Sequence, residues 1–180
     1  MGTSANGLWP IGTYWHLETR PDELQAMQDG PLKSAAQQID DVLNQAKYQT
    51  LVHGDAKVAN FCFANEPAAE FAVAAVDFQY VGRGVGVKDV AYFISSCLSD
   101  SEAERMEESL LNFYFHRLGS ALNSQNSDCD PVQVECEWRK LYPFAWADFC
   151  RFLQGWSPGH WKLNGYSSRL TKQVMAALNG

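Results

Sequence analysis

The sequence predicts an α+β fold that is mainly helical, with a small antiparallel β-hairpin. Two short apolar runs, Leu51-Val52 and Phe71 to Val76, each lead into a cluster of polar residues, which is typical of strands that end at a functional site. Much of the remaining chain has apolar residues at helical spacing. Because 46% of the 180 residues are hydrophobic, we expect a single domain with one core.

The composition argues against several classes of protein. The formal net charge is −7, whereas nucleic acids and anionic membranes call for clustered Lys and Arg. The five cysteines include no C-x-x-C pair, so neither a disulfide framework nor a zinc site is indicated. No apolar run reaches the roughly 18 residues of a membrane-spanning helix, and no signal peptide is visible at the start. We therefore expect a soluble, cytoplasmic protein.

The chain before the first apolar run is expected to form two helices after an irregular start. Residues 1–7 are small and polar and predict a flexible start. Residues 8–16 are aromatic and contain Pro and Gly, which favours an irregular segment packed on a surface. Pro21, followed by acidic residues, opens one helix. A second helix is predicted from residue 31 or 32 to about 46, where the apolar residues share one face.

Three polar residues in this part are interpreted without a catalytic role. His16 is isolated among aromatic residues, which is more typical of a structural histidine than of a catalytic base. Asp40 and Asp41 are adjacent, and adjacent residues do not face each other on a helix. We therefore interpret both as solvated charges.

The polar clusters that follow the two apolar runs predict a site for metal-assisted chemistry. His53-Gly54-Asp55 follows the first run, with Asn60 soon after, and Asp77-Phe78-Gln79 follows the second. The side-chain oxygens of Asn60 and Asp77 are hard ligands that Mg²⁺ accepts alongside phosphate oxygens and water. Asp55 is then free to accept a proton from a hydroxyl group.

These residues resemble a known family. The stretch from His53 to Asn60 is similar to the H-G-D-x-x-x-x-N motif of the aminoglycoside phosphotransferase and choline kinase-like families, which are relatives of the protein kinases. Asp77-Phe78-Gln79 stands where the kinases have D-F-G. With the Gly-rich segment and the K-D-V-A-Y-F run that follow it, this motif looks like the ecdysteroid kinase-like (CHK-type) branch.

The resemblance implies a protein-kinase-like C-lobe over residues 8–180, in which the hairpin carries the catalytic and metal loops. It implies a transferase that uses ATP and Mg²⁺ to phosphorylate a hydroxyl of a small-molecule alcohol. By the same resemblance, Asp55 would be the catalytic base. Asn60 and Asp77 would bind magnesium and, through it, the nucleotide.

Three further residues take roles from the resemblance. Lys57 would lie near the transferring phosphoryl group and count as both catalytic and cofactor-binding, although an exposed loop lysine explains it equally well. His53 belongs to the catalytic motif. Asp89 would brace the catalytic loop from the start of a helix. A plain helix N-terminal Asp, favoured by the helix dipole, is compatible with that role.

The second half of the chain is expected to be helical. The glycine-rich residues 82–87 are interpreted as a flexible connector, with Arg83 as a candidate phosphate or substrate contact. Ser101 and Glu104 predict a capping box at the start of the helix expected over residues 101–122. Pro143 predicts a bend in the helix expected over residues 132–153. Helices are expected over residues 89–98, 101–122, 132–153 and 166–178.

Four of the six tryptophans lie in the final third of the chain, and two explanations remain open for them. Large aromatic side chains are usually core residues. In the families named above, however, this helical region lines the acceptor site, and aromatic faces bind cations or flat ligands. The four are Trp138, Trp146, Trp156 and Trp161.

Related kinases carry a smaller N-lobe ahead of this part, with a glycine-rich turn over the phosphates and a strand lysine. Residues 1–50 show neither, so we expect the C-lobe only, with an N-lobe supplied by a missing segment. The chain is then either the C-lobe of a small-molecule kinase or a catalytically inactive, lobe-only binding module. A metal-dependent hydrolase is a weaker hypothesis, because such sites usually need more ligands, often His.

Overall fold

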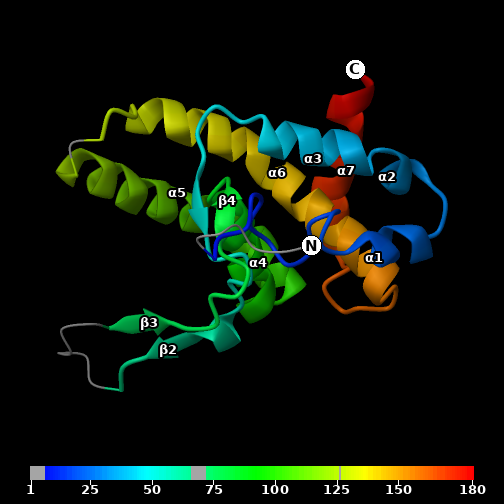
Figure 1. Ribbon diagram of the computed structural model, residues 1–180, viewed down its shortest axis with the longest axis horizontal. Helices are drawn as coiled ribbons and strands as arrows, with labels where there is room; N and C mark the ends of the chain where they lie inside the picture. The colour runs from blue at the N-terminus through cyan, green and yellow to red at the C-terminus, as the bar shows by residue number, and fades with distance from the viewer. Residues whose placement is uncertain (1–6, 66–71, 126) are drawn as a thin grey trace.

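A computed structural model describes residues 7–65, 72–125 and 127–180 (Figure 1). These residues form a mainly helical body and two small antiparallel sheets, which confirms the predicted α+β class. Residues 1–6 of the expected flexible start lie outside the described residues. The elements are α1 (Pro21–Ala26), α2 (Pro31–Ser34), α3 (Ala36–Asn44), β1 (Thr50–Val52), the 3₁₀ helix η1 (Val58–Asn60), β2 (Phe61–Phe63), β3 (Val73–Ala75), β4 (Gly82–Gly84), α4 (Val87–Cys97), α5 (Asp100–Ser124), α6 (Pro131–Trp156) and α7 (Gly165–Asn179).

Helix α6 is the central element of the body, and α1, α3, α4, α5 and α7 all pack against it (Figure 1). Asp130 caps its N-terminus, because the Asp130 carboxylate accepts a hydrogen bond from Val132 N at 2.9 Å. The first residue of the helix is Pro131, which suits this position. Most of its second half is buried, including aromatic residues on more than one side. A helix with apolar residues around most of its circumference is stable only inside a core, which explains its position.

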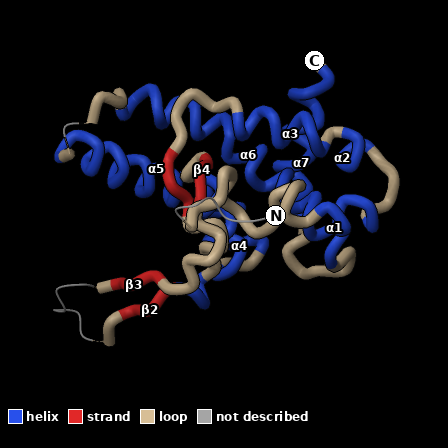
Figure 2. The backbone as a smooth tube through the Cα atoms, viewed as in Figure 1, coloured by secondary structure: helices blue, strands red, loops and turns tan. Residues whose placement is uncertain are grey.

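The strands form two separate two-stranded sheets (Figure 2). β2 pairs with β3 and forms the predicted hairpin, with Cys62 opposite Ala74. β1 pairs instead with β4, with Leu51 opposite Arg83. The prediction of a flexible connector over residues 82–87 is therefore wrong, because the first three of these residues form β4 and the last one begins α4.

Glycine explains why this strand is hard to recognise in the sequence. Gly82 is crossed closely by the N-terminal segment, where Trp9 N donates to Val81 O at 2.9 Å and Gly12 N donates to Arg83 O at 2.8 Å. A Cβ atom on Gly82 would collide with the backbone of Trp9 and Gly12. The strand thus needs small residues for this contact rather than the β-branched residues that usually mark strands.

Several helix boundaries differ from the prediction. The single helix expected from about residue 31 to 46 is divided by a turn at Ala35 into α2 and α3. The capping box of α5 is formed by Ser99 and Glu102, whose carboxylate accepts from Ser99 N at 2.9 Å, and not by Ser101 and Glu104. Both motifs have the same spacing, so the sequence pattern alone did not separate them. None of the helices in the described parts of the chain is long and apolar enough to cross a membrane.

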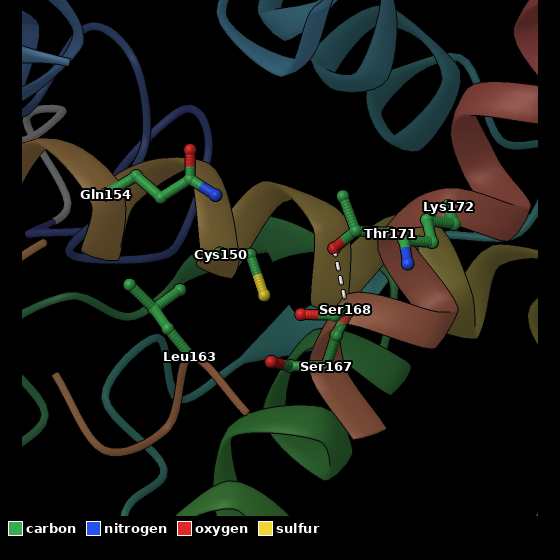
Figure 3. Close-up of a pocket in the computed structure, with 7 residues that line it drawn as sticks. All are labelled: Cys150, Gln154, Leu163, Ser167, Ser168, Thr171 and Lys172. Atoms are coloured by element: carbon green, nitrogen blue, oxygen red, sulfur yellow. Dashed lines mark hydrogen bonds between the residues drawn. The ribbon is translucent and has the colours of Figure 1, made fainter. Parts of the chain in front are cut away.

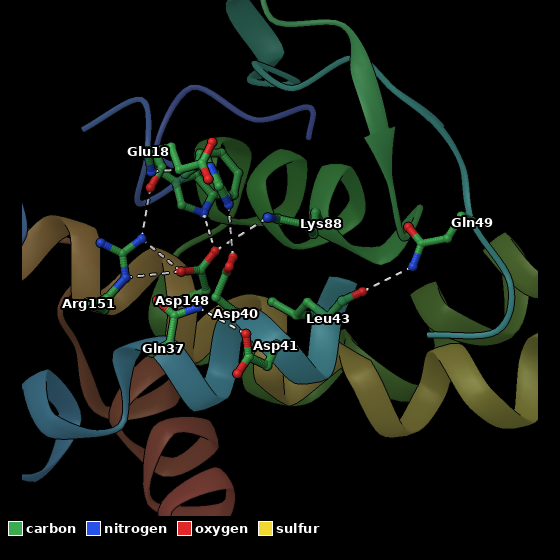
Figure 4. Close-up of polar contacts among 11 residues, drawn as sticks. Glu18, Gln37, Asp40, Asp41, Leu43, Gln49, Lys88, Asp148 and Arg151 are labelled. Atoms are coloured by element: carbon green, nitrogen blue, oxygen red, sulfur yellow. Dashed lines mark hydrogen bonds and ion pairs between the residues drawn. The ribbon is translucent and has the colours of Figure 1, made fainter. Parts of the chain in front are cut away.

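A buried ionic cluster joins the N-terminal segment, α4 and α6 (Figure 4). Asp148 Oδ1 accepts from Arg151 Nη2 at 2.8 Å and from Arg151 Nε at 3.0 Å. Its Oδ2 accepts from Trp15 Nε1 at 3.0 Å and lies 3.4 Å from Lys88 Nζ. Burial opposes ionisation of Asp148, but the positive charges of Arg151 and Lys88 outweigh it and hold the pKa of this carboxyl below its usual value.

Asp40 does not lie in solvent, as the sequence interpretation proposed. It is 6% exposed, and its Oδ1 lies 3.2 Å from Nε2 of His16, which is also buried. Its neighbour Asp41 is exposed, as expected. The pairing supports a structural role for His16. It was not predictable from the helix pattern because the two residues are distant in sequence.

We expect Arg151→Met to lower the free energy of unfolding by about 3–5 kcal/mol, because it leaves the Asp148 carboxylate buried without its main partner. Arg139→Met is the matched control, since its ion pair with Glu135 is partly exposed and is worth about 1 kcal/mol or less. Urea unfolding at pH 7 measures both. Equal losses in the two variants would show that the cluster contributes no more than a surface pair.

Candidate functional site

The turn after β1 requires glycine at its centre. Gly54 has a φ of +80°, in the left-handed region, and a Cβ there would collide with Tyr80 O and lie 2.9 Å from Thr13 N. Gly54 O also accepts from Tyr14 N at 3.0 Å. The N-terminal segment and the chain after β3 therefore enclose this turn and position Asp55, which follows it.

Asp89 holds the same turn from the first turn of α4. Its Oδ2 accepts from His53 N at 2.6 Å, and its Oδ1 accepts from Gly54 N at 3.1 Å. Burial raises the pKa of the Asp89 carboxyl above its usual value, while the two backbone donors act in the opposite direction. The His53 ring lies at the other side of the turn, with Nε2 2.8 Å from Val76 O.

Asp55 has two oxygens in different environments. It is 4% exposed. Oδ2 accepts from Lys57 Nζ at 2.8 Å and from Asn60 Nδ2 at 3.1 Å. Oδ1 is buried and has no hydrogen-bond partner among the described residues. A buried carboxylate oxygen without a donor is costly unless a ligand supplies one.

Asn60 and Asp77 lie at the base of the β2–β3 hairpin. Val76 N donates to Asn60 O at 2.9 Å. Asp77 is the next residue after Val76, so its backbone lies near that of Asn60. Asn60 Nδ2 donates to the carbonyl of Asp55 at 2.8 Å as well as to its carboxylate, which leaves Oδ1 as the amide atom able to bind a cation. Asp77 is exposed and has a φ of +66°, a strained conformation for a non-glycine residue.

The side-chain oxygens of Asn60 and Asp77 fit the ligand chemistry of magnesium. Mg²⁺ is usually bound by one or two protein oxygens, with waters and phosphate oxygens completing its coordination. Within the described residues, no cluster of three or more His, Cys, Asp or Glu side chains could hold a metal ion.

The tryptophans of the final third divide into two groups. Trp138 and Trp146 are 3% and 2% exposed and belong to the main core. Trp156 and Trp161 are 55% and 58% exposed. They lie on both sides of His160, with ring centroids 5.9 and 5.8 Å from its ring. The core explanation is therefore confirmed for the first pair only.

Sequence reasoning missed two residues near Asp55. Burial raises the pKa of Tyr92 above its usual value, and the nearby Tyr14 and Asp55 add to this effect. Tyr92 was recognisable in principle, because it lies one helical turn after Asp89. The second residue is Lys162. Burial is the main cause that lowers its pKa; the charge of Lys57 also lowers it, and the charge of Asp55 raises it. It is far from both in sequence, and no motif links it to them.

The helical body and the hairpin border two cavities of interest. An apolar cavity of about 660 Å³ lies between the hairpin, α4 and α5, and His53 and Asp89 are among its lining residues. A smaller cavity of about 170 Å³ is bounded mainly by α6 and α7 (Figure 3). Cys150 and Thr171 line this smaller cavity, and none of the candidate site residues does. The larger cavity therefore borders the turn that carries Asp55, whereas the smaller one does not.

Comparison with known protein families identifies a match. The model of the ecdysteroid kinase-like family matches residues 12–127, which is more than half of the chain. This range includes β1, the turn that carries Asp55, the hairpin and α4. Searches of curated proteins and of solved structures find no match.

We expect Asp89→Ala to lower the free energy of unfolding by about 1–3 kcal/mol, because it leaves two backbone N–H groups of the turn without an acceptor. Asp22→Ala is the control, since Asp22 is an exposed acidic residue in the first turn of α1 and has only the helix dipole to lose. Hydrogen exchange of the His53 and Gly54 amides provides a local readout. Unchanged protection of both amides in Asp89→Ala would contradict the bracing contact.

Proposed function

Because the chain belongs to the ecdysteroid kinase-like family, we propose that it transfers the γ-phosphoryl group of ATP to a hydroxyl of a small molecule. The family supports a kinase-like phosphotransferase fold. The observation that carries the proposal is the asymmetry of Asp55. One carboxylate oxygen is held by Lys57 and Asn60, while the other is buried and has no hydrogen-bond donor within the described part of the chain.

In this proposal Asp55 is the catalytic base. The bonds to Oδ2 fix the orientation of the carboxylate. Oδ1 then accepts a hydrogen bond from the acceptor hydroxyl and takes its proton as the oxygen attacks phosphorus. Oδ1 is a buried acceptor without a hydrogen-bond donor among the described residues, and this supports the role, because a substrate hydroxyl would supply a donor.

Lys57 supplies positive charge beside the base. Its ammonium is 2.8 Å from Asp55 Oδ2 and is partly exposed, so it can contact a ligand while keeping this ion pair. Negative charge is spread over the phosphoryl oxygens during transfer, and a fixed cation stabilises it. We therefore propose Lys57 as both a catalytic and a nucleotide-binding residue.

Asn60 Oδ1 and the Asp77 carboxylate would hold magnesium. When bound there with ATP, the ion supplies positive charge to the phosphate oxygens. The left-handed backbone at Asp77 supports this role, since strained conformations concentrate at functional sites. His53 and Asp89 would act as positioning residues for the turn rather than touch the substrate. We further propose that residues 8–180 act as the C-lobe and that an N-lobe completes the nucleotide site.

We expect Asp77→Asn to weaken binding of magnesium-ATP at least about tenfold, because the amide gives the ion one uncharged ligand in place of a carboxylate. Asp55→Asn should leave this affinity nearly unchanged, since Asp55 acts on the hydroxyl and not on the ion. Calorimetric titration of the folded proteins measures both. Equal weakening in the two variants, or none in either, would contradict the assigned roles.

A further inference from the structure

Lys162, in the connection between α6 and α7, is a buried cation packed on aromatic rings. It is 9% exposed, and its Nζ lies 4.8 Å from the ring centre of Tyr92, 5.4 Å from that of Phe149 and 5.5 Å from that of Trp161. Among the described residues, Nζ has neither an ion pair nor a hydrogen bond. Aromatic faces attract a cation but supply no anionic acceptor.

The charged groups that act on Lys162 include Lys57 and Asp55 of the proposed catalytic site. Burial and the positive charge of Lys57 together lower the pKa of Lys162 to about 8, while Cys97 and Asp55 act in the opposite direction. Lys162 in turn helps to lower the pKa of His160, for which burial is the larger cause.

The contacts of Tyr92 connect Lys162 to the turn that carries Asp55. The ring of Tyr92 lies 4.8 Å from Lys162 Nζ, and its hydroxyl donates to the hydroxyl of Tyr14 at 3.5 Å. Tyr14 N in turn donates to the carbonyl of Gly54, the residue before Asp55, at 3.0 Å.

Two neighbouring cations are costly to hold near each other in a partly buried site, and one aspartate balances only one of them. An anionic ligand removes this imbalance. A phosphoryl group fits, because it carries up to two negative charges and three acceptor oxygens, and because it must pass beside Asp55 in the proposed reaction.

We propose that Lys162 is a phosphoryl-binding residue of this site, which holds the phosphoryl group together with Lys57. The proposal rests on the proposed function and extends it to a residue outside the family match, which ends at residue 127. The same chemistry applies to the terminal phosphate of a nucleotide and to the phosphate ester of the product. Trp161, which is exposed beside Lys162, would then form part of the wall of the acceptor pocket.

The test is a titration with sulfate, which mimics a phosphoryl dianion and keeps its charge from pH 7 to pH 10. At pH 7 we expect Lys162→Met to weaken sulfate binding by about tenfold, the usual effect of losing one charge-assisted contact. Lys140→Met, at an exposed position on α6, should bind as the unmodified protein does. Thermal unfolding verifies that each variant is folded.

The pH profile separates anion binding from a purely structural role. Sulfate favours the protonated amine, so affinity should fall as pH rises through about 8, where Lys162 loses its proton. Lys162→Arg keeps its charge in this range and should retain affinity at pH 9.5. If Lys162→Met binds sulfate as tightly as the unmodified protein, or if Lys162→Arg loses affinity with pH in the same way, the proposal is overturned.

Two further probes identify the source of the phosphoryl group and separate this proposal from the proposed function. Weaker binding of magnesium-ATP to Lys162→Met, with magnesium-ADP unaffected, would place Lys162 at the nucleotide. Weaker binding of methyl phosphate would place it at the product. If magnesium-ATP binds in an Asp77-dependent way but no anion depends on Lys162, only the present proposal fails. If sulfate depends on Lys162 but no nucleotide binds, the anion site stands and the kinase function fails.

Discussion

The position of the candidate site depends on the carboxylate of Asp148 in the middle of α6. It is 1% exposed and binds Arg151, Lys88 and the indole of Trp15. Lys88 precedes Asp89 on α4, so the ion pair that fixes this helix in the core also fixes the carboxylate that holds His53 and Gly54. A buried charge is tolerated only with its partners in place. The cluster therefore makes the core and the turn that carries Asp55 one structural unit.

The N-terminal segment completes this unit because glycines let its backbone approach closely. Gly12 crosses Gly82 on β4, and Thr13 and Tyr14 bond to the chain around Gly54. Trp15, the next residue, reaches the Asp148 cluster. One stretch of four residues thus contacts β4, the turn that carries Asp55 and the core helix α6. Small changes there would be transmitted to Asp55 through backbone contacts rather than through side chains.

The sequence was sufficient to predict the helical class and the hairpin, and it singled out Lys57 and Asn60, which contact Asp55, because these side chains lie at short spacings along the chain. It was insufficient where a contact joins distant segments. Asp40 looked like a surface charge until His16 was brought beside it, and β4 lacked a strand pattern because its glycines serve a backbone crossing. Lys162 was missed for the same reason: its relation to Asp55 exists only after α6 and α7 are packed.

Two chemically different kinds of side chain contribute to the proposed site around Asp55. Asn60 and Asp77 carry hard oxygens, which in the proposed function would hold a metal-bound nucleotide. Lys57 and Lys162 carry positive charge, and Lys162 lies beside aromatic rings, which in the same proposal suits a phosphoryl group and an organic acceptor. In the proposed reaction, the carboxylate of Asp55 would take the proton of the acceptor hydroxyl as phosphorus moves from donor to acceptor. This set of charges supports the proposal of phosphoryl transfer, because the two lysines would offset the negative charge that builds on the phosphoryl oxygens while Asp55 remains available as the base.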